Sequence, residues 1–218
     1  KISRERTFFQ YRGANAHFSE DSFNWDDVDC DLLHIAYILL LDELDKEDSE
    51  YGTKMARLLA HAKERGIKTS IDVVSETGER FGRLVPPALR YTDYCIINEI
   101  EASRSTGIQL RAEDGALIYE NVKKVLSKLF ELGVSEWAVI HSPEGGFGMD
   151  KDGDYAECGL VYTPSGFIKG KVGAGDAFCA GVLSAAHRGL SLLDAVKLGN
   201  AAATVSLRSP GAVSYTHL

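Results

Sequence analysis

The sequence lacks a long apolar run. Its longest one, Ile35 to Leu41, has only seven residues, whereas a membrane-spanning helix needs about 20. The first residues, Lys1 to Arg6, carry charges with no apolar segment behind them, so a signal peptide is not expected. These absences predict a protein that has no membrane partner.

Cysteine and positive charge are also scarce. The four cysteines lie far apart and form no CxxC pair, so neither a disulfide framework nor a zinc site is expected, and a reducing cytoplasm is the predicted compartment. The chain has 24 Lys+Arg against 32 Asp+Glu, a net charge of -8, which argues against nucleic-acid binding. A phosphorylated small molecule stays compatible with this charge, because backbone N–H groups can bind an anion.

The order of apolar patterns predicts an α/β fold in one domain, from 218 residues of which 44% are hydrophobic. Strand patterns occur at 7–11, 33–40, 67–74, 94–97, 137–141, 147–149 and 155–162. Helical patterns begin near Tyr51 and cover 118–129, 175–189 and 191–207, and Pro86 and Pro87 are expected to interrupt a further one before Leu89. Strands that alternate with helices imply crossover connections and a mainly parallel sheet with helices on both faces.

A glycine-rich stretch, Lys171 to Phe178 (KVGAGDAF), stands at the start of a long helical pattern. Glycine lets a backbone approach a ligand closely, and the first N–H groups of a helix have no partner inside it. The stretch therefore predicts an anion site. Asp176, in the first turn, is placed to accept a proton from a hydroxyl that attacks phosphorus. The alternative is that Asp176 is only a favourable acidic residue at the positive end of the helix dipole.

A second polar motif, Asn98 to Glu101, follows the strand pattern at 94–97. Ligands gather at the carboxyl ends of strands in open α/β sheets. An amide and a carboxylate at that place suit Mg²⁺, which keeps several of its waters. The alternative is that Glu99 and Glu101 are only favourable charges at a helix N-terminus.

Three motifs occur in a fixed order: Asn98-x-x-Glu101, the loop Gly173 to Gly181, and a tail formed by Gly199 to Thr204 with Pro210 to Ala212. With these three motifs together, the chain resembles the PfkB/ribokinase family of carbohydrate kinases over the range from Arg6 to Ala212. The resemblance implies a three-layer ribokinase-like fold, with a mainly parallel central sheet. It also implies transfer of the γ-phosphoryl group of ATP to a sugar hydroxyl.

The resemblance further assigns residues to roles. Asp176 would be the general base, and the backbone N–H groups of Gly173, Ala174 and Gly175 would form the anion hole. Asn98 and Glu101 would position Mg²⁺ and phosphate through water. The adenine side would be lined by Asn200, Ala203 and Gly211, and the sugar would be touched by Arg12 and Asn15. For Arg12 a solvated surface charge is an equal alternative.

The chain also departs from the family pattern. Gly170 stands where an aspartate often supports a K⁺ site, which leaves the use of K⁺ open. Asp72 is kept at the end of its strand, but the asparagine common two residues later is missing, and Ser142 replaces a family glycine.

The family's usual opening, a glycine-pair box with the first strand and an acceptor-binding aspartate, is absent. We therefore expect residues 1–212 to be a single kinase domain truncated at its N-terminus, and 213–218 to be a non-native tail. The unpaired sheet edge that this leaves, and the family's habit of dimerising, make a homodimer an expectation. Two alternatives stay open: a nucleoside kinase on the same scaffold, and a nucleotide-binding fragment without catalysis.

Overall fold

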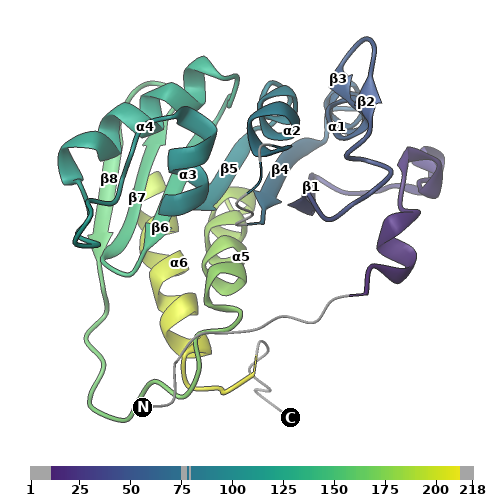
Figure 1. Cartoon of the computed structure of the whole chain (residues 1–218). Coiled ribbons are helices and arrows are strands. Elements are labelled where there is room, and N and C mark those ends of the chain that lie inside the picture. Colours follow the sequence, from purple (N-terminus) through teal and green to yellow (C-terminus); the bar gives the residue numbers. More distant parts are fainter. Residues whose placement is uncertain (1–10, 75–77, 79, 212–218) are drawn as a thin grey trace.

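A six-stranded sheet is the centre of the computed structural model, which describes residues 11–74, 78 and 80–211. The strand order is β1-β4-β5-β6-β7-β8 (Figure 1). The first four are mutually parallel, and β7 and β8 continue the sheet antiparallel. Their bounds are β1 (Leu32–Ile38), β4 (Lys68–Val73), β5 (Tyr94–Asn98), β6 (Trp137–Ser142), β7 (Gly145–Asp150) and β8 (Tyr155–Gly159). A separate antiparallel pair consists of β2 (Glu47–Asp48) and β3 (Gly52–Thr53).

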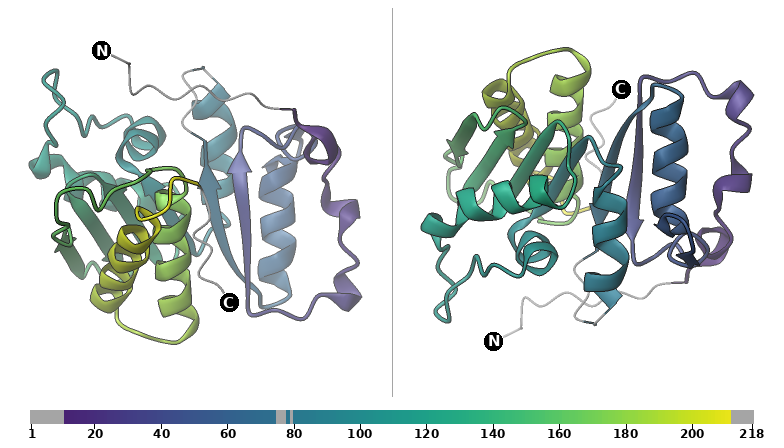
Figure 2. Two further views of the ribbon diagram at one scale, coloured as in Figure 1. Left: turned by 90° about the horizontal axis from the view of Figure 1, so that it is seen from below. Right: turned by 90° about the horizontal axis from the view of Figure 1, so that it is seen from above.

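Helices cover both faces of this sheet (Figure 2). One face carries α1 (Lys54–Glu64), α2 (Arg80–Leu89), α3 (Glu99–Thr106) and α4 (Tyr119–Glu131). The other face carries α5 (Ala174–His187) and α6 (Leu192–Ser206). Alternate residues of β5 divide between the two cores, because Cys95 and Ile97 pack with the first group and Ile96 with the second. These three layers confirm the predicted α/β fold class.

Most expected elements are present with shifted ends, and one expectation is wrong. Pro86 and Pro87 do not interrupt a helix: α2 runs through both of them. Each proline removes one helical hydrogen bond. The helix nevertheless buries Phe81, Leu84, Val85, Ala88 and Leu89 against the core, and this burial offsets the lost bonds.

The ends of the chain differ more from the expectations. The strand expected at 7–11 lies outside the described residues except for Tyr11, which is not in a strand. A short 3-10 helix, Gly13–Ala16, follows Arg12. The strand expected to reach 162 ends at Gly159. Among the residues that the structure describes, no helix is long and apolar enough to cross a membrane.

The carboxyl ends of β1, β4, β5 and β6 share one edge of the sheet, because these strands are parallel. The start of α5 lies at this edge: a Cβ atom on Gly175 would come 3.2 Å from Cε1 of His141, near the end of β6. The helix is held there by very close packing on α6, since a Cβ atom on Gly181 would lie 2.8 Å from the carbonyl oxygen of Leu198.

Candidate active site

The N-terminus of α5 presents backbone N–H groups to the strand ends. Gly173 caps the helix in a left-handed conformation (φ 81°), which glycine adopts without strain. The first intrahelical bond runs from the N–H of Ala177 to the carbonyl of Gly173, at 2.9 Å. The helix begins one residue earlier than expected, so the N–H groups that precede this bond belong to Ala174, Gly175 and Asp176, with Gly173 as the cap.

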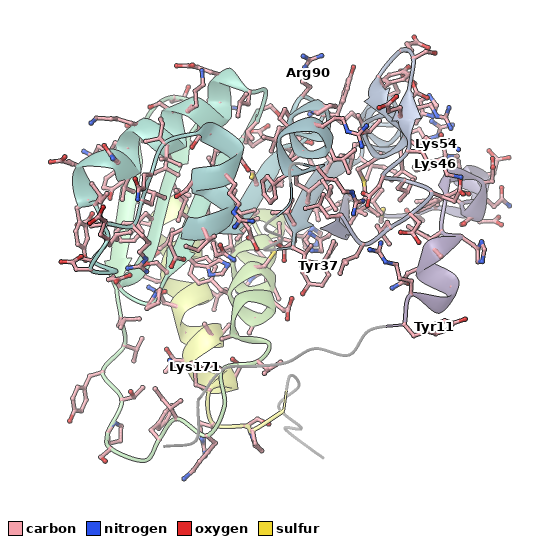
Figure 3. All side chains as sticks on the ribbon, viewed as in Figure 1. Tyr11, Tyr37, Lys46, Lys54, Arg90 and Lys171 are labelled. Carbon is pink, nitrogen blue, oxygen red and sulfur yellow. The ribbon has the colours of Figure 1, made fainter. Side chains whose placement is uncertain are left out.

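Asp176 is exposed, and its Oδ1 accepts a hydrogen bond from the hydroxyl of Tyr37. Tyr37 is the penultimate residue of β1, and Figure 3 shows its side chain beside α5. The carboxylate is therefore neither buried against aliphatic neighbours nor turned away from the sheet edge. The alternative interpretation, in which Asp176 only interacts favourably with the helix dipole, does not require a hydrogen bond from a distant strand. The contact with Tyr37 is therefore a feature that this alternative does not explain.

Further carboxylates lie close enough to act on this pair electrostatically. Burial, followed by the charges of Glu101 and Asp176, raises the pKa of Asp72 to about 8. Burial also raises the pKa of Tyr37, and its hydrogen bond to Asp176 adds to the effect. At neutral pH, Asp72 and Tyr37 therefore both keep their protons, and Tyr37 acts as a hydrogen-bond donor.

Two histidines near Asp176 contribute no positive charge. Burial lowers the pKa of His141 to about 4, although the charge of Asp176 opposes the shift. Burial lowers the pKa of His34 as well, and a ring nitrogen of His34 is 3.1 Å from Oγ of Ser70. Both rings are therefore neutral at pH 7, and neither adds positive charge beside the N-terminus of α5.

Asn98 and Glu101 form a capping box at the start of α3. Oδ1 of Asn98 accepts from the N–H groups of Ile100 and Glu101, both at 2.9 Å, and Oε2 of Glu101 accepts from the N–H of Asn98 at 2.9 Å. The helix-terminus alternative thus accounts for part of this motif. Glu99 faces elsewhere and pairs at 2.7 Å with Arg111, which also binds Glu144.

The same residues decide how a magnesium ion would be held. The described part of the chain contains no group of three or more His, Cys, Asp or Glu side chains placed to hold a metal. A cage of direct ligands is therefore not what these residues build. Glu101 acts on Asp72 and Tyr37, so its negative charge reaches the centre of the site. That suits a hydrated Mg²⁺ held through its waters beside a phosphate.

The residues expected on the adenine side lie on or after α6. Asn200 is buried, and its Nδ2 donates to the carbonyl oxygens of Cys158 (2.8 Å) and Gly159 (3.2 Å). Its amide nitrogen therefore fastens α6 to the end of β8. Ala203 is half-buried in the core under α5 and α6, and Gly211 is exposed at the end of the described chain.

The residues expected on the sugar side come before β1. Arg12 forms an ion pair with Asp42 and donates to the carbonyl oxygen of Leu39 at 3.3 Å. It is half-buried and so is not the freely solvated charge of the alternative interpretation. Asn15 is exposed in the short 3-10 helix. The structure thus links Arg12 to the turn that follows Tyr37, and it leaves Asn15 at the surface.

Sequence reasoning left Tyr37, His34 and His141 out of the site, and it noted Asp72 without placing it there. Asp72 carried a signal, because a carboxylate stands at the carboxyl end of a predicted strand. Tyr37 carried none. It lies inside the longest apolar run, where a tyrosine is normally interpreted as part of the core.

Comparisons with known proteins agree with this architecture. Over 71 residues the chain is 39% identical to a 2-dehydro-3-deoxygluconokinase of Bacillus subtilis (strain 168). This match covers 29% of this chain and 21% of that protein. The ribokinase of Thermotoga maritima superposes with a TM-score of 0.67 at 20% identity, over 93% of this chain and 59% of that one. Ribokinase of Arabidopsis thaliana, solved with ribose and ATP, gives a TM-score of 0.58 at 20% identity, over 72% of this chain and 47% of that one.

The chain therefore spans less than two thirds of the length of each of these relatives. The structural likenesses, at this identity, establish the fold. The model of the pfkB family of carbohydrate kinases matches residues 2–217, nearly the whole chain. The chain belongs to the pfkB family of carbohydrate kinases.

Proposed function

We propose that the protein carrying this chain transfers the γ-phosphoryl group of ATP to a hydroxyl group of a sugar. The observation that carries the proposal is the position of Asp176. Its exposed carboxylate stands beside backbone N–H groups that precede the first hydrogen bond of α5. A proton acceptor and an anion cradle within one helical turn are the two parts that phosphoryl transfer to an alcohol requires.

In this mechanism the N–H groups of Ala174, Gly175 and Asp176 bind the oxygens of the phosphoryl group as negative charge moves between them. Asp176 accepts the proton of the attacking sugar hydroxyl. A bound Mg²⁺ would neutralise charge on the phosphates, with Asn98 and Glu101 orienting its waters. His141 stays neutral against Gly175 and fills space beside the cradle.

The outer parts of the site belong to the same proposal. Asn200, Ala203 and Gly211 border the adenine side, and Arg12 and Asn15 the sugar side. A carboxylate at position 170 is not part of it. A Cβ atom on Gly170 would lie 2.6 Å from the carbonyl oxygen of Ser209, so the local backbone leaves no room for a side chain there.

The test is Asp176→Asn in a coupled assay of ADP release. We expect kcat to fall by about 10²- to 10⁴-fold with little change in KM for ATP, because asparagine keeps the shape but cannot take the proton. Asp194→Asn is the matched control, since Asp194 is also an exposed acid in a first helical turn, that of α6. It should leave turnover unchanged. Near-normal turnover in Asp176→Asn would refute the assignment of the base.

The same assay separates the remaining alternatives. A panel of sugars and nucleosides as acceptors distinguishes a sugar kinase from a nucleoside kinase. Calorimetry with Mg-ATP measures nucleotide binding independently of transfer. ATP binding with no transfer to any acceptor would favour a nucleotide-binding fragment for this chain, and would leave the reaction proposed for the full-length protein intact.

A further inference from the structure

Two segments that are 139 residues apart meet at one hydrogen bond, from the hydroxyl of Tyr37 to Oδ1 of Asp176. Tyr37 comes from β1, at the edge of the sheet, and Asp176 from the first turn of α5. We propose that Tyr37 is a positioning residue that orients the carboxylate of Asp176 for proton transfer. This inference rests on the proposed role of Asp176 as the base.

The bond leaves the two oxygens of Asp176 in different situations. Oδ1 accepts from Tyr37, and no side chain in the described part of the chain donates to Oδ2. Burial and the neighbouring carboxylates raise the pKa of Tyr37, so its hydroxyl stays protonated and donates. A carboxylate held through one oxygen presents the other in a fixed direction, and that is the oxygen available to the acceptor hydroxyl.

Tyr37 lies in an irregular part of β1. The pairing of β1 with β4 is regular up to Ile35 and shifts before Ile38, so Tyr37 stands at an irregularity of the ladder. Such irregularities re-aim side chains next to active sites. The tyrosine whose hydroxyl reaches Asp176 on α5 lies within this shifted stretch.

The turn after Tyr37 is also held. Leu39 is fully buried with a left-handed backbone (φ 83°), a conformation that is costly for leucine. Its N–H donates to the buried Asp45 at 3.0 Å, and its carbonyl oxygen accepts from Arg12 at 3.3 Å. A strained conformation persists only where its surroundings over-determine it. Here these bonds fix the backbone two residues beyond Tyr37.

The alternative is that the Tyr37 side chain only packs at the sheet edge. The substitution Tyr37→Phe distinguishes this packing role from the positioning role. Phenylalanine keeps the ring and removes the hydroxyl. We expect kcat to fall by about 10- to 100-fold, with KM for ATP and the midpoint of thermal unfolding unchanged. Tyr155→Phe is the matched control. Tyr155 on β8 also donates to a carboxylate, Oε2 of Glu157 at 2.6 Å, and its loss should leave kcat unchanged.

A double-mutant cycle with Asp176→Asn completes the test. If Tyr37 acts through Asp176, adding Tyr37→Phe to Asp176→Asn should lower kcat by less than twofold further. Wild-type kcat in Tyr37→Phe, or losses that multiply in the double variant, would overturn the inference. A lowered unfolding midpoint together with a raised KM for ATP would also overturn it, because packing alone would then explain the effect. If Asp176→Asn itself keeps normal turnover, the proposed base fails instead.

Discussion

Replacing Asp72 with asparagine should flatten the dependence of stability on pH between about pH 4 and pH 8. Asp72 stands at the end of β4, where burial and then the charges of Glu101 and Asp176 raise its pKa to about 8. In the unfolded chain its carboxyl titrates near its ordinary value of 3.8. Between these two values the folded protein holds a proton that the unfolded chain has lost.

The sign and the size of the effect follow from that proton. The contribution of Asp72 is fully present below about pH 4 and is lost as the pH rises toward 8, so the wild type loses stability across this range. One proton corresponds to at most about 3 kcal/mol between pH 5 and pH 7. Asparagine has nearly the same shape, does not titrate, and its Oδ1 can still accept from the N–H of Val73, a bond of 2.7 Å.

The assay is urea unfolding of both proteins at pH 5, 6, 7 and 8. The difference in unfolding free energy should move steadily in favour of Asp72→Asn as the pH rises. His34 and His141 titrate in both proteins, so their contributions cancel in that difference. Asp152→Asn is the control, because it removes an exposed carboxylate, and its curve should run parallel to the wild type. If the Asp72→Asn curve is parallel as well, Asp72 is ionised in the folded protein and the reasoning about the carboxylates is wrong.

Two further predictions concern the scaffold. Gly181→Ala should lower the unfolding free energy by about 1–3 kcal/mol, because the new methyl group would lie 2.8 Å from the carbonyl oxygen of Leu198. The control, Gly82→Ala, lies in open space on α2 and should raise the unfolding free energy by about 0.5–1 kcal/mol. Equal effects of the two substitutions would contradict the close packing of α5 on α6. Asp93→Asn should cost about 3 kcal/mol at pH 7. Burial tends to raise the pKa of Asp93, but hydrogen bonds from Lys63 and other donors outweigh it and lower that pKa. The cost, followed by urea unfolding, should therefore shrink as the pH falls through the lowered value, and a constant cost would contradict this account.

The sequence predicted those parts of the fold that depend on local periodicity. The helical pattern that contains Val122, Val125, Leu126 and Leu129 became α4, because each of these residues faces the core. The glycine loop was found for a similar reason, since a left-handed cap at Gly173 is a local demand of the backbone. The continuation of α2 through Pro86 and Pro87 was missed, because the cost of these prolines is local while the burial that offsets it comes from the tertiary structure.

The composition of the site could not be predicted in the same way. The contact between Tyr37 and Asp176 joins residues 139 positions apart, and Tyr37 lies at a register shift in β1 that no local sequence pattern predicts. Asn98 and Glu101 were found, but their capping role and any role toward a metal use the same residue types at the same spacing. Only coordinates show which backbone groups their oxygens accept from.

The balance of charge connects the stability of this site with its proposed chemistry. No lysine or arginine in the described part of the chain pairs with Asp176, Arg111 is engaged by Glu99 and Glu144, and the two nearby histidines are neutral. Near Asp176 the charges of the described residues are therefore those of carboxylates such as Glu101, and a phosphate would approach these together with the N–H groups at the start of α5. Each ionised carboxylate would repel it, and the repulsion grows where water is excluded. The proton that burial keeps on Asp72 removes one of those charges at neutral pH. The folded protein thus loses stability through Asp72 as the pH rises, and by the same titration it would lose part of its tolerance for a bound phosphate.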